Sequence, residues 1–173
     1  MATLTLLRHA QAEPHAPTGE DIDRPLSMRG REQAKELGAV LRAHDAVPEL
    51  VLCSSANRAA QTWKLSGLAD GDDATIEVRV LADIYGADAA ELLDLIREIP
   101  PEISRVLVVG HEPVMSHLAR ILAGQESDEA AAERVRTGIS TATLAFLDVP
   151  GAWADLERRS ATLTGLARPE GDH

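Results

Sequence analysis

The stretch that decides the fold is "TLTLLRHAQAE", residues 3–13, in which an apolar segment runs directly into an arginine and a histidine. Residues 3–7 predict a short buried strand, because β-branched and apolar side chains follow one another without a charge. Buried strands usually end in turn residues such as Gly, Asn, Asp or Pro. Arg8 and His9 at that point suggest either a solvated loop or the floor of an anion site.

Working outward from this stretch, strands and helices alternate. Apolar runs predict further strands at 49–55, 75–83, 105–111 and 140–149, with an edge strand at 151–160. Helical patterns lie at 24–45 with Ser27 as N-cap, from about 56, at 88–99, at 113–124 and at 126–136. This order predicts an α/β fold, a three-layer α/β/α sandwich with a mostly parallel central sheet.

Composition limits the domain count and the partners. With 173 residues and 45% hydrophobic content, the chain predicts one domain over 1–166, followed by a flexible tail at 167–173. A net charge of −11 argues against nucleic-acid or anionic-membrane partners, so an anionic substrate must be captured by local positive charge. The single Cys53 excludes an intramolecular disulfide. Without a basic leader or an apolar run of about 20 residues, we expect a cytoplasmic protein, taken to be a monomer.

Chemistry-bearing residues follow four of the predicted strands. Arg8 and His9 follow the first, Arg58 the second, Asp83 the third and His111 the fourth. Ligands of such sheets bind outside the carboxyl ends of the strands, so these side chains are expected to meet at one edge. Arginines match phosphate oxygens, and a histidine among cations stays neutral and nucleophilic. The set predicts phosphoryl transfer without a metal or other cofactor.

Other interpretations of single residues are weaker. Cys53 and Arg58 have the spacing Cys-x4-Arg, whereas a cysteine phosphatase loop uses Cys-x5-Arg. His111 and His117 are six residues apart and share no ligand spacing for a metal. His15, in the loop after the first motif, is either a surface residue or a substrate contact.

Four segments together resemble the histidine phosphatase superfamily. "LLRHAQAE" resembles its Arg-His-Gly signature, "RPLSMRGREQA" its Leu-Ser/Thr-x-x-Gly-x-x-Gln-Ala helix, "SSANRAAQT" its Ser-x-x-x-Arg-Ala-x-Gln-Thr segment and "VVGHEP" the segment of its second histidine. They occur in family order over residues 3–120, and "TGISTATLAFLD" resembles a later strand. The short chain and its "DxxRPLSxxG" pattern are most similar to bacterial phosphohistidine phosphatases of the SixA type.

The resemblance implies a phosphoglycerate-mutase-like fold and a role for each matched residue. His9 matches the histidine that is transiently phosphorylated, and Arg8, Arg58 and His111 match the phosphate pocket. In "LADIYG", Asp83 matches a family acid that is usually Glu. Ala10 replaces the usual Gly, and "AEPHAP" lacks the Asn found in mutase-like members.

The resemblance implies hydrolysis of phosphohistidine on a protein through phospho-His9. Two alternatives stay open: a phosphoesterase or phosphomutase acting on a small phosphorylated metabolite, and a phosphate-binding adaptor without turnover. The absence of a long insertion that could form a lid favours an open site and a substrate that is either macromolecular or chemically undemanding.

Overall fold

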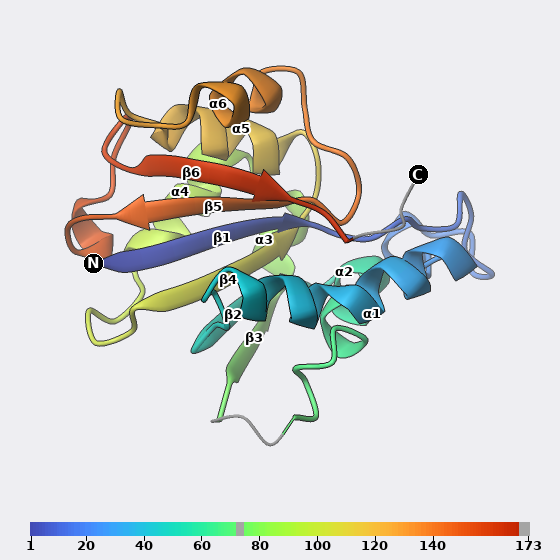
Figure 1. Ribbon diagram of the computed structural model, residues 1–173. Coiled ribbons are helices and arrows are strands. Elements are labelled where there is room, and N and C mark those ends of the chain that lie inside the picture. The colour runs from blue at the N-terminus through green and yellow to red at the C-terminus, as the bar shows by residue number, and fades with distance from the viewer. Residues whose placement is uncertain (72–74, 170–173) are drawn as a thin grey trace.

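A computed structural model describes residues 1–71 and 75–169 of the chain (Figure 1). Its six strands form one sheet in the order β3-β2-β4-β1-β5-β6. The strands are β1 (Ala2–Arg8), β2 (Leu50–Ser54), β3 (Glu77–Leu81), β4 (Arg105–Gly110), β5 (Leu144–Val149) and β6 (Thr162–Ala167). β1, β2, β3 and β4 pair in parallel, and β5 runs antiparallel to both of its neighbours. The predicted α/β fold with a mostly parallel sheet is confirmed.

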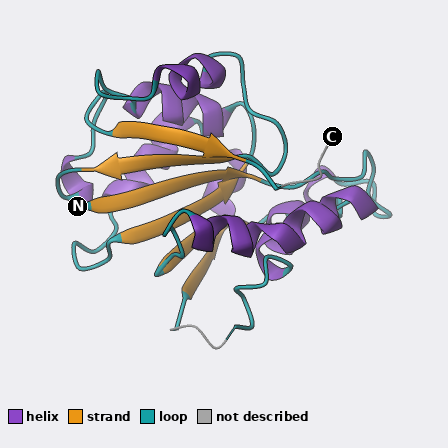
Figure 2. Cartoon of the chain, in the orientation of Figure 1, coloured by secondary structure: helices purple, strands orange, loops and turns teal. Residues whose placement is uncertain are grey.

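Helices cover both faces of this sheet (Figure 2). They are α1 (Met28–Ala43), α2 (Asn57–Lys64), α3 (Ala82–Gly86), α4 (Ala89–Arg97), α5 (Val114–Leu122) and α6 (Glu129–Val135), with 3-10 turns η1 (Asp21–Asp23) and η2 (Trp153–Asp155). Ser27 caps α1 as predicted, because its side chain accepts from the Gly30 amide. Asp88 caps α4 through a capping box with Glu91.

The strands divide their apolar side chains between two cores because successive residues of a strand point to opposite faces. Leu4 and Leu6 of β1 pack into the core that α4, α5 and α6 complete, whereas Leu7 packs into the core of α1 and α2. The central strands β1, β2 and β4 are therefore apolar on both sides, as a sheet covered by helices requires. Burial on both faces fixes the register and, with it, the position of every strand end.

The first turn of α1 is pressed against the loop that follows β1. A Cβ atom built on Gly30 would overlap the carbonyl oxygen of Gln11, so only glycine fits there. The Ser27 amide donates to the same carbonyl at 3.0 Å. This close approach holds the segment after His9 against α1.

The structure differs from the sequence-based expectations near the C-terminus. The edge strand predicted at 151–160 is wrong: η2 forms there, with Trp153 buried and its Nε1 donating to Ile103 O at 2.7 Å. The edge strand is instead β6, which pairs with β5 across a register shift. β6 reaches Ala167, and Arg168 donates to Thr141 O, so the predicted tail begins as ordered chain. Residues 170–173 lie outside the described residues. Within the described residues, no helix is long and apolar enough to span a membrane.

Candidate active site

The strand order brings the predicted residues to one edge of the sheet. β1 lies beside β4, and β4 beside β2, so the segments after these three strands are neighbours. The His9 amide donates to Gly110 O at 3.0 Å, and the ring centroids of His9 and His111 are 5.3 Å apart. Arg58 enters from the first turn of α2. Four of the five predicted site residues, Arg8, His9, Arg58 and His111, therefore lie together.

His9 is held in one tautomer, and the lone pair of its second nitrogen faces Arg58. Its Nδ1 lies 2.7 Å from Ala10 O, and the Arg58 Nε–H points at its Nε2 at 3.3 Å. A carbonyl accepts and a guanidinium only donates, so we assign the proton to Nδ1 and the lone pair to Nε2. Burial is the main cause that lowers the pKa of His9 to about 3; the Ala10 bond opposes it, and His111, Arg58 and Arg8 add to it. His9 is therefore a neutral imidazole at physiological pH.

Arg58 is 6% exposed and connects the nucleophilic nitrogen to a carboxylate. Its Nη1 donates to Asp21 O at 2.9 Å and its Nη2 to Asp21 Oδ2 at 3.2 Å, in addition to the contact of Nε with His9. The donors of the planar guanidinium are fixed relative to one another. Asp21 and His9 are thus both held by one rigid group.

Arg8 is fixed by the loop that precedes β5. Its Nη1 donates to Ile139 O at 2.8 Å, whereas its buried Nε has no partner among the described residues. Ile139 N donates in turn to Glu112 Oε2 at 3.0 Å. Burial, with a further contribution from Arg168, lowers the pKa of Arg8, and the nearby Glu112 charge opposes this. Glu112 was not among the residues predicted from the sequence, although it follows His111 directly.

His111 is positioned by Ser54 at the end of β2. Its Nε2 lies 2.7 Å from Ser54 Oγ, which also accepts from the Ala56 amide at 3.2 Å. Among the described residues, Nε2 is the one acceptor that the Ser54 hydroxyl contacts, so we assign the hydroxyl proton to this bond, which places the ring proton on Nδ1. Nδ1 is buried and has no partner among the described residues. Burial, followed by the Arg58 charge, lowers the pKa of His111 to about 4, although Asp21 opposes this.

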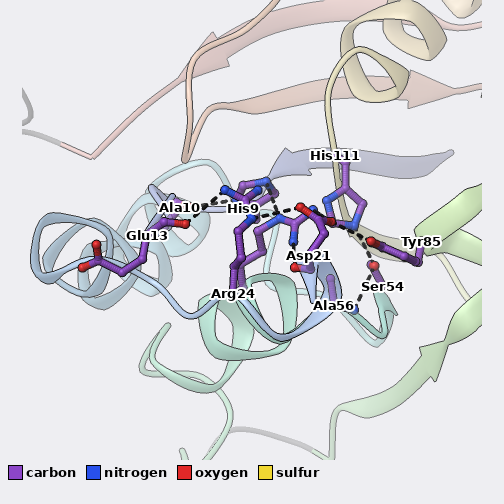
Figure 3. A network of polar contacts seen from close by, with 10 residues as sticks. His9, Ala10, Glu13, Asp21, Arg24, Ser54, Ala56, Tyr85 and His111 are labelled. Carbon is purple, nitrogen blue, oxygen red and sulfur yellow. Dashed lines mark hydrogen bonds and ion pairs between the residues drawn. The ribbon is translucent and has the colours of Figure 1, made fainter. Parts of the chain in front are cut away.

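Asp21, Arg24 and Tyr85 form a network at the edge of this site that sequence reasoning did not identify (Figure 3). Tyr85 Oη donates to Asp21 Oδ2 at 2.6 Å, and Arg24 Nε donates to Asp21 Oδ1 at 3.0 Å. Tyr85 also presents its ring edgewise to His111. The "DxxR" spacing contained the signal for Asp21 and Arg24, but Tyr85 comes from α3, about 60 positions further along.

Two residues singled out from the sequence are not held by the site. Asp83 is exposed in the first turn of α3, and among the described residues no hydrogen bond or ion pair joins it to the site. Its role as an acid stays a prediction. His15 is exposed, and it lines a surface depression together with Asp21 and Arg24. It therefore lies beside the network, although no hydrogen bond joins it to the network within the described residues.

The competing chemistries find no support in the described part of the chain. Cys53 is buried within β2, and burial raises the pKa of its thiol to about 12, which keeps it protonated. His117 is exposed on α5. No group of three or more metal-ligating side chains occurs in the described ranges 1–71 and 75–169.

The arrangement is suited to bind and attack a phosphoryl group. It offers one imidazole lone pair, on His9 Nε2. The hydrogen-bond donors near this nitrogen belong to Arg8, Arg58 and His111. Two of these donors, Arg8 Nε and His111 Nδ1, are buried and have no partner in the part of the chain that the structure describes, a costly state unless a ligand supplies acceptors. Phosphoryl oxygens are such acceptors.

Comparisons with known proteins agree with this geometry. The model of the histidine phosphatase superfamily (branch 1) matches residues 4–141. The uncharacterized protein Rv1276c of Mycobacterium tuberculosis is 39% identical over 165 residues, 94% of this chain and 99% of its own. A structure of a candidate phosphohistidine phosphatase SixA from Nakamurella multipartitia is 33% identical with a TM-score of 0.84, covering 98% of this chain and 97% of the other. The corresponding protein of Agrobacterium tumefaciens is 27% identical with a TM-score of 0.76, covering 97% and 99%.

The family match extends from β1 to the loop before β5, and it includes Arg8, His9, Arg58 and His111. The structural likeness extends over nearly the whole chain. The chain therefore belongs to branch 1 of the histidine phosphatase superfamily, and it is a phosphatase.

Proposed function

We propose that this phosphatase removes phosphoryl groups from phosphohistidine on a protein, through a phospho-His9 intermediate and without a metal ion. The observation that carries the proposal is the state of His9: a neutral ring whose Nδ1 is bound to Ala10 O and whose Nε2 faces Arg58. A neutral imidazole held in one orientation is a competent nucleophile toward phosphorus.

In the proposed reaction, His9 Nε2 attacks phosphorus in line with the leaving nitrogen of the substrate. Arg8, Arg58 and His111 bind the equatorial oxygens, whose charge is spread in the transition state. The imidazole of the substrate leaves, and a water molecule then attacks phospho-His9 to release phosphate. Fixed donors at these oxygens stabilise both transition states because they need no reorganisation.

Two observations support phosphohistidine as the substrate class. The relatives at 33% and 27% identity are candidate phosphohistidine phosphatases and match nearly the full chain. In addition, the side of the site formed by Asp21 is open, since its side chain is 54% exposed, which suits a histidine on a protein surface.

The test compares three substrates with the purified protein: a phosphohistidine protein, a phosphosugar and an aryl phosphate. We expect kcat/KM to be highest for the phosphohistidine protein, and His9→Ala to abolish both turnover and the acid-labile, alkali-stable label on the enzyme. A higher kcat/KM for the phosphosugar would contradict the substrate class. Labelling that persists in His9→Ala would contradict the intermediate.

A further inference from the structure

Asp21 occupies an unusual place among the carboxylates of the chain. Its Oδ2 accepts from Tyr85 Oη at 2.6 Å and from Arg58 Nη2 at 3.2 Å, and its Oδ1 accepts from Arg24 Nε at 3.0 Å. The same Arg58 guanidinium contacts His9 Nε2 through its Nε. The carboxylate and the attacking nitrogen therefore contact the same guanidinium, so Asp21 lies next to a group that is proposed to bind the phosphoryl oxygens.

The other nearby carboxylates are engaged elsewhere or have no contact with the site. Glu112 accepts from the amide and hydroxyl of Ser116 and from Ile139 N. Asp23, in the same turn as Asp21, accepts from the Thr18 hydroxyl. Among the described residues, Asp21 is the one carboxylate that bonds to Arg58.

We propose that Asp21 is the catalytic proton donor and acceptor of this site, with Tyr85 and Arg24 as the residues that aim its carboxyl group. The proposal rests on the phospho-His9 mechanism above. It assigns the proton transfer to the loop between β1 and α1, whereas the sequence resemblance assigned it to Asp83 in α3.

The resting carboxylate is ionised, because the Tyr85 hydrogen bond and the charges of Arg58 and Arg24 lower the pKa of Asp21 against a smaller effect of burial. A bound phosphoryl group places negative charge beside Asp21 and also offsets part of the positive charge of Arg58. Both changes favour the protonated carboxyl, which takes up a proton from water at its exposed side.

The two steps then balance. As the His9 Nε2–P bond forms, the bond from phosphorus to the leaving oxygen or nitrogen breaks, and the Asp21 carboxyl gives its proton to that leaving atom. In the second step, water adds its oxygen to phosphorus, its proton passes to the Asp21 carboxylate, and the Nε2–P bond breaks. Asp21 releases this proton to solvent when phosphate departs and the pKa of its carboxyl falls again.

The experiment measures how Asp21→Asn depends on the leaving group. With an alkyl phosphate, whose leaving group needs a proton, we expect kcat/KM to fall about 10²-fold or more, the usual contribution of an acid catalyst. With an aryl phosphate, which departs as a stable anion, we expect a loss below about tenfold. Phospho-His9 should accumulate on the aryl substrate in this variant, because only its hydrolysis still needs the missing base.

Three further variants keep the test decisive. Asp23→Asn, in the same turn, should leave activity unchanged, and Asp83→Asn should show no dependence on the leaving group. Asp21→Ala should regain alkyl phosphate hydrolysis when formate is added, which is a readout that a positioning role would not produce.

The proposal would be overturned if Asp21→Asn lost kcat/KM equally on both substrates and phospho-His9 did not accumulate. It would also be overturned if Asp21→Asn lost no activity, or if the loss in Asp83→Asn depended on the leaving group. Failure of the wild-type protein to form phospho-His9 would instead overturn the proposed function itself. The two failures are therefore distinguishable.

Discussion

Replacing Arg58 tests the central contact of the site. Arg58→Ala removes the donors to His9 Nε2, Asp21 O and Asp21 Oδ2, at 3.3, 2.9 and 3.2 Å, together with a buried charge next to the phosphoryl position. Loss of one preorganised donor costs about 3–4 kcal/mol in the transition state, so kcat/KM should fall about 10²- to 10³-fold.

Lysine separates the charge of Arg58 from its geometry. Arg58→Lys keeps the cation but has no planar fork to hold His9 and Asp21 together, so its kcat/KM should lie between the values of the alanine variant and the wild type. The assay is aryl phosphate hydrolysis, with the melting temperature as a control for folding. Arg79→Ala serves as the matched control, because Arg79 pairs with Glu77 on the exposed strand β3.

The outcome that refutes this reasoning is a folded Arg58→Ala variant whose kcat/KM stays within about threefold of the wild-type value. Arg58 would then act as a structural link between α2 and η1, and the phosphoryl group would be bound by other donors. A fully active lysine variant would show instead that charge alone matters.

Three further results are expected. Activity should persist in strong chelators, because arginines supply the charge in the site; loss that a divalent ion restores would show a metal requirement. The contribution of His9 to the free energy of unfolding is complete above its unfolded pKa of 6.5 and is lost as pH falls toward its folded pKa of about 3. Between pH 7 and pH 5, urea unfolding should therefore show that the free energy of unfolding of the wild type falls by about 2 kcal/mol more than that of His9→Asn. Equal falls in the two proteins would refute this. Gly30→Ala should lower the melting temperature because its Cβ overlaps the Gln11 carbonyl, whereas Gly165→Ala, with open space, should not; equal shifts would contradict the close packing.

The site around His9 could be predicted from the sequence because the geometry of a parallel sheet is regular. Apolar runs fixed the strands, and a parallel sheet brings their carboxyl ends together, so Arg8, His9 and His111 had to be neighbours. Arg58 followed from its place in the first turn after β2.

The partners of these residues were harder to predict because they depend on irregular chain. Asp21 reaches Arg58 through a 3-10 turn inside a long loop, and no periodic pattern specifies where such a turn lies. Tyr85 reaches Asp21 only through the tertiary arrangement of α3. The strand β6 was missed because Gly165 interrupts an already short apolar pattern, beside a register shift in its pairing with β5.

Main-chain carbonyls accept hydrogen bonds from three of the reactive groups. Ala10 O fixes the His9 ring, Ile139 O holds Arg8, and Asp21 O receives Arg58. A carbonyl is present whichever residue occupies the position, so a substitution such as Ile139→Ala would leave this acceptor in place. Homologues can therefore diverge at such positions and keep the same catalytic geometry, whereas a one-residue insertion or deletion in either loop would disrupt it without changing a single reactive residue.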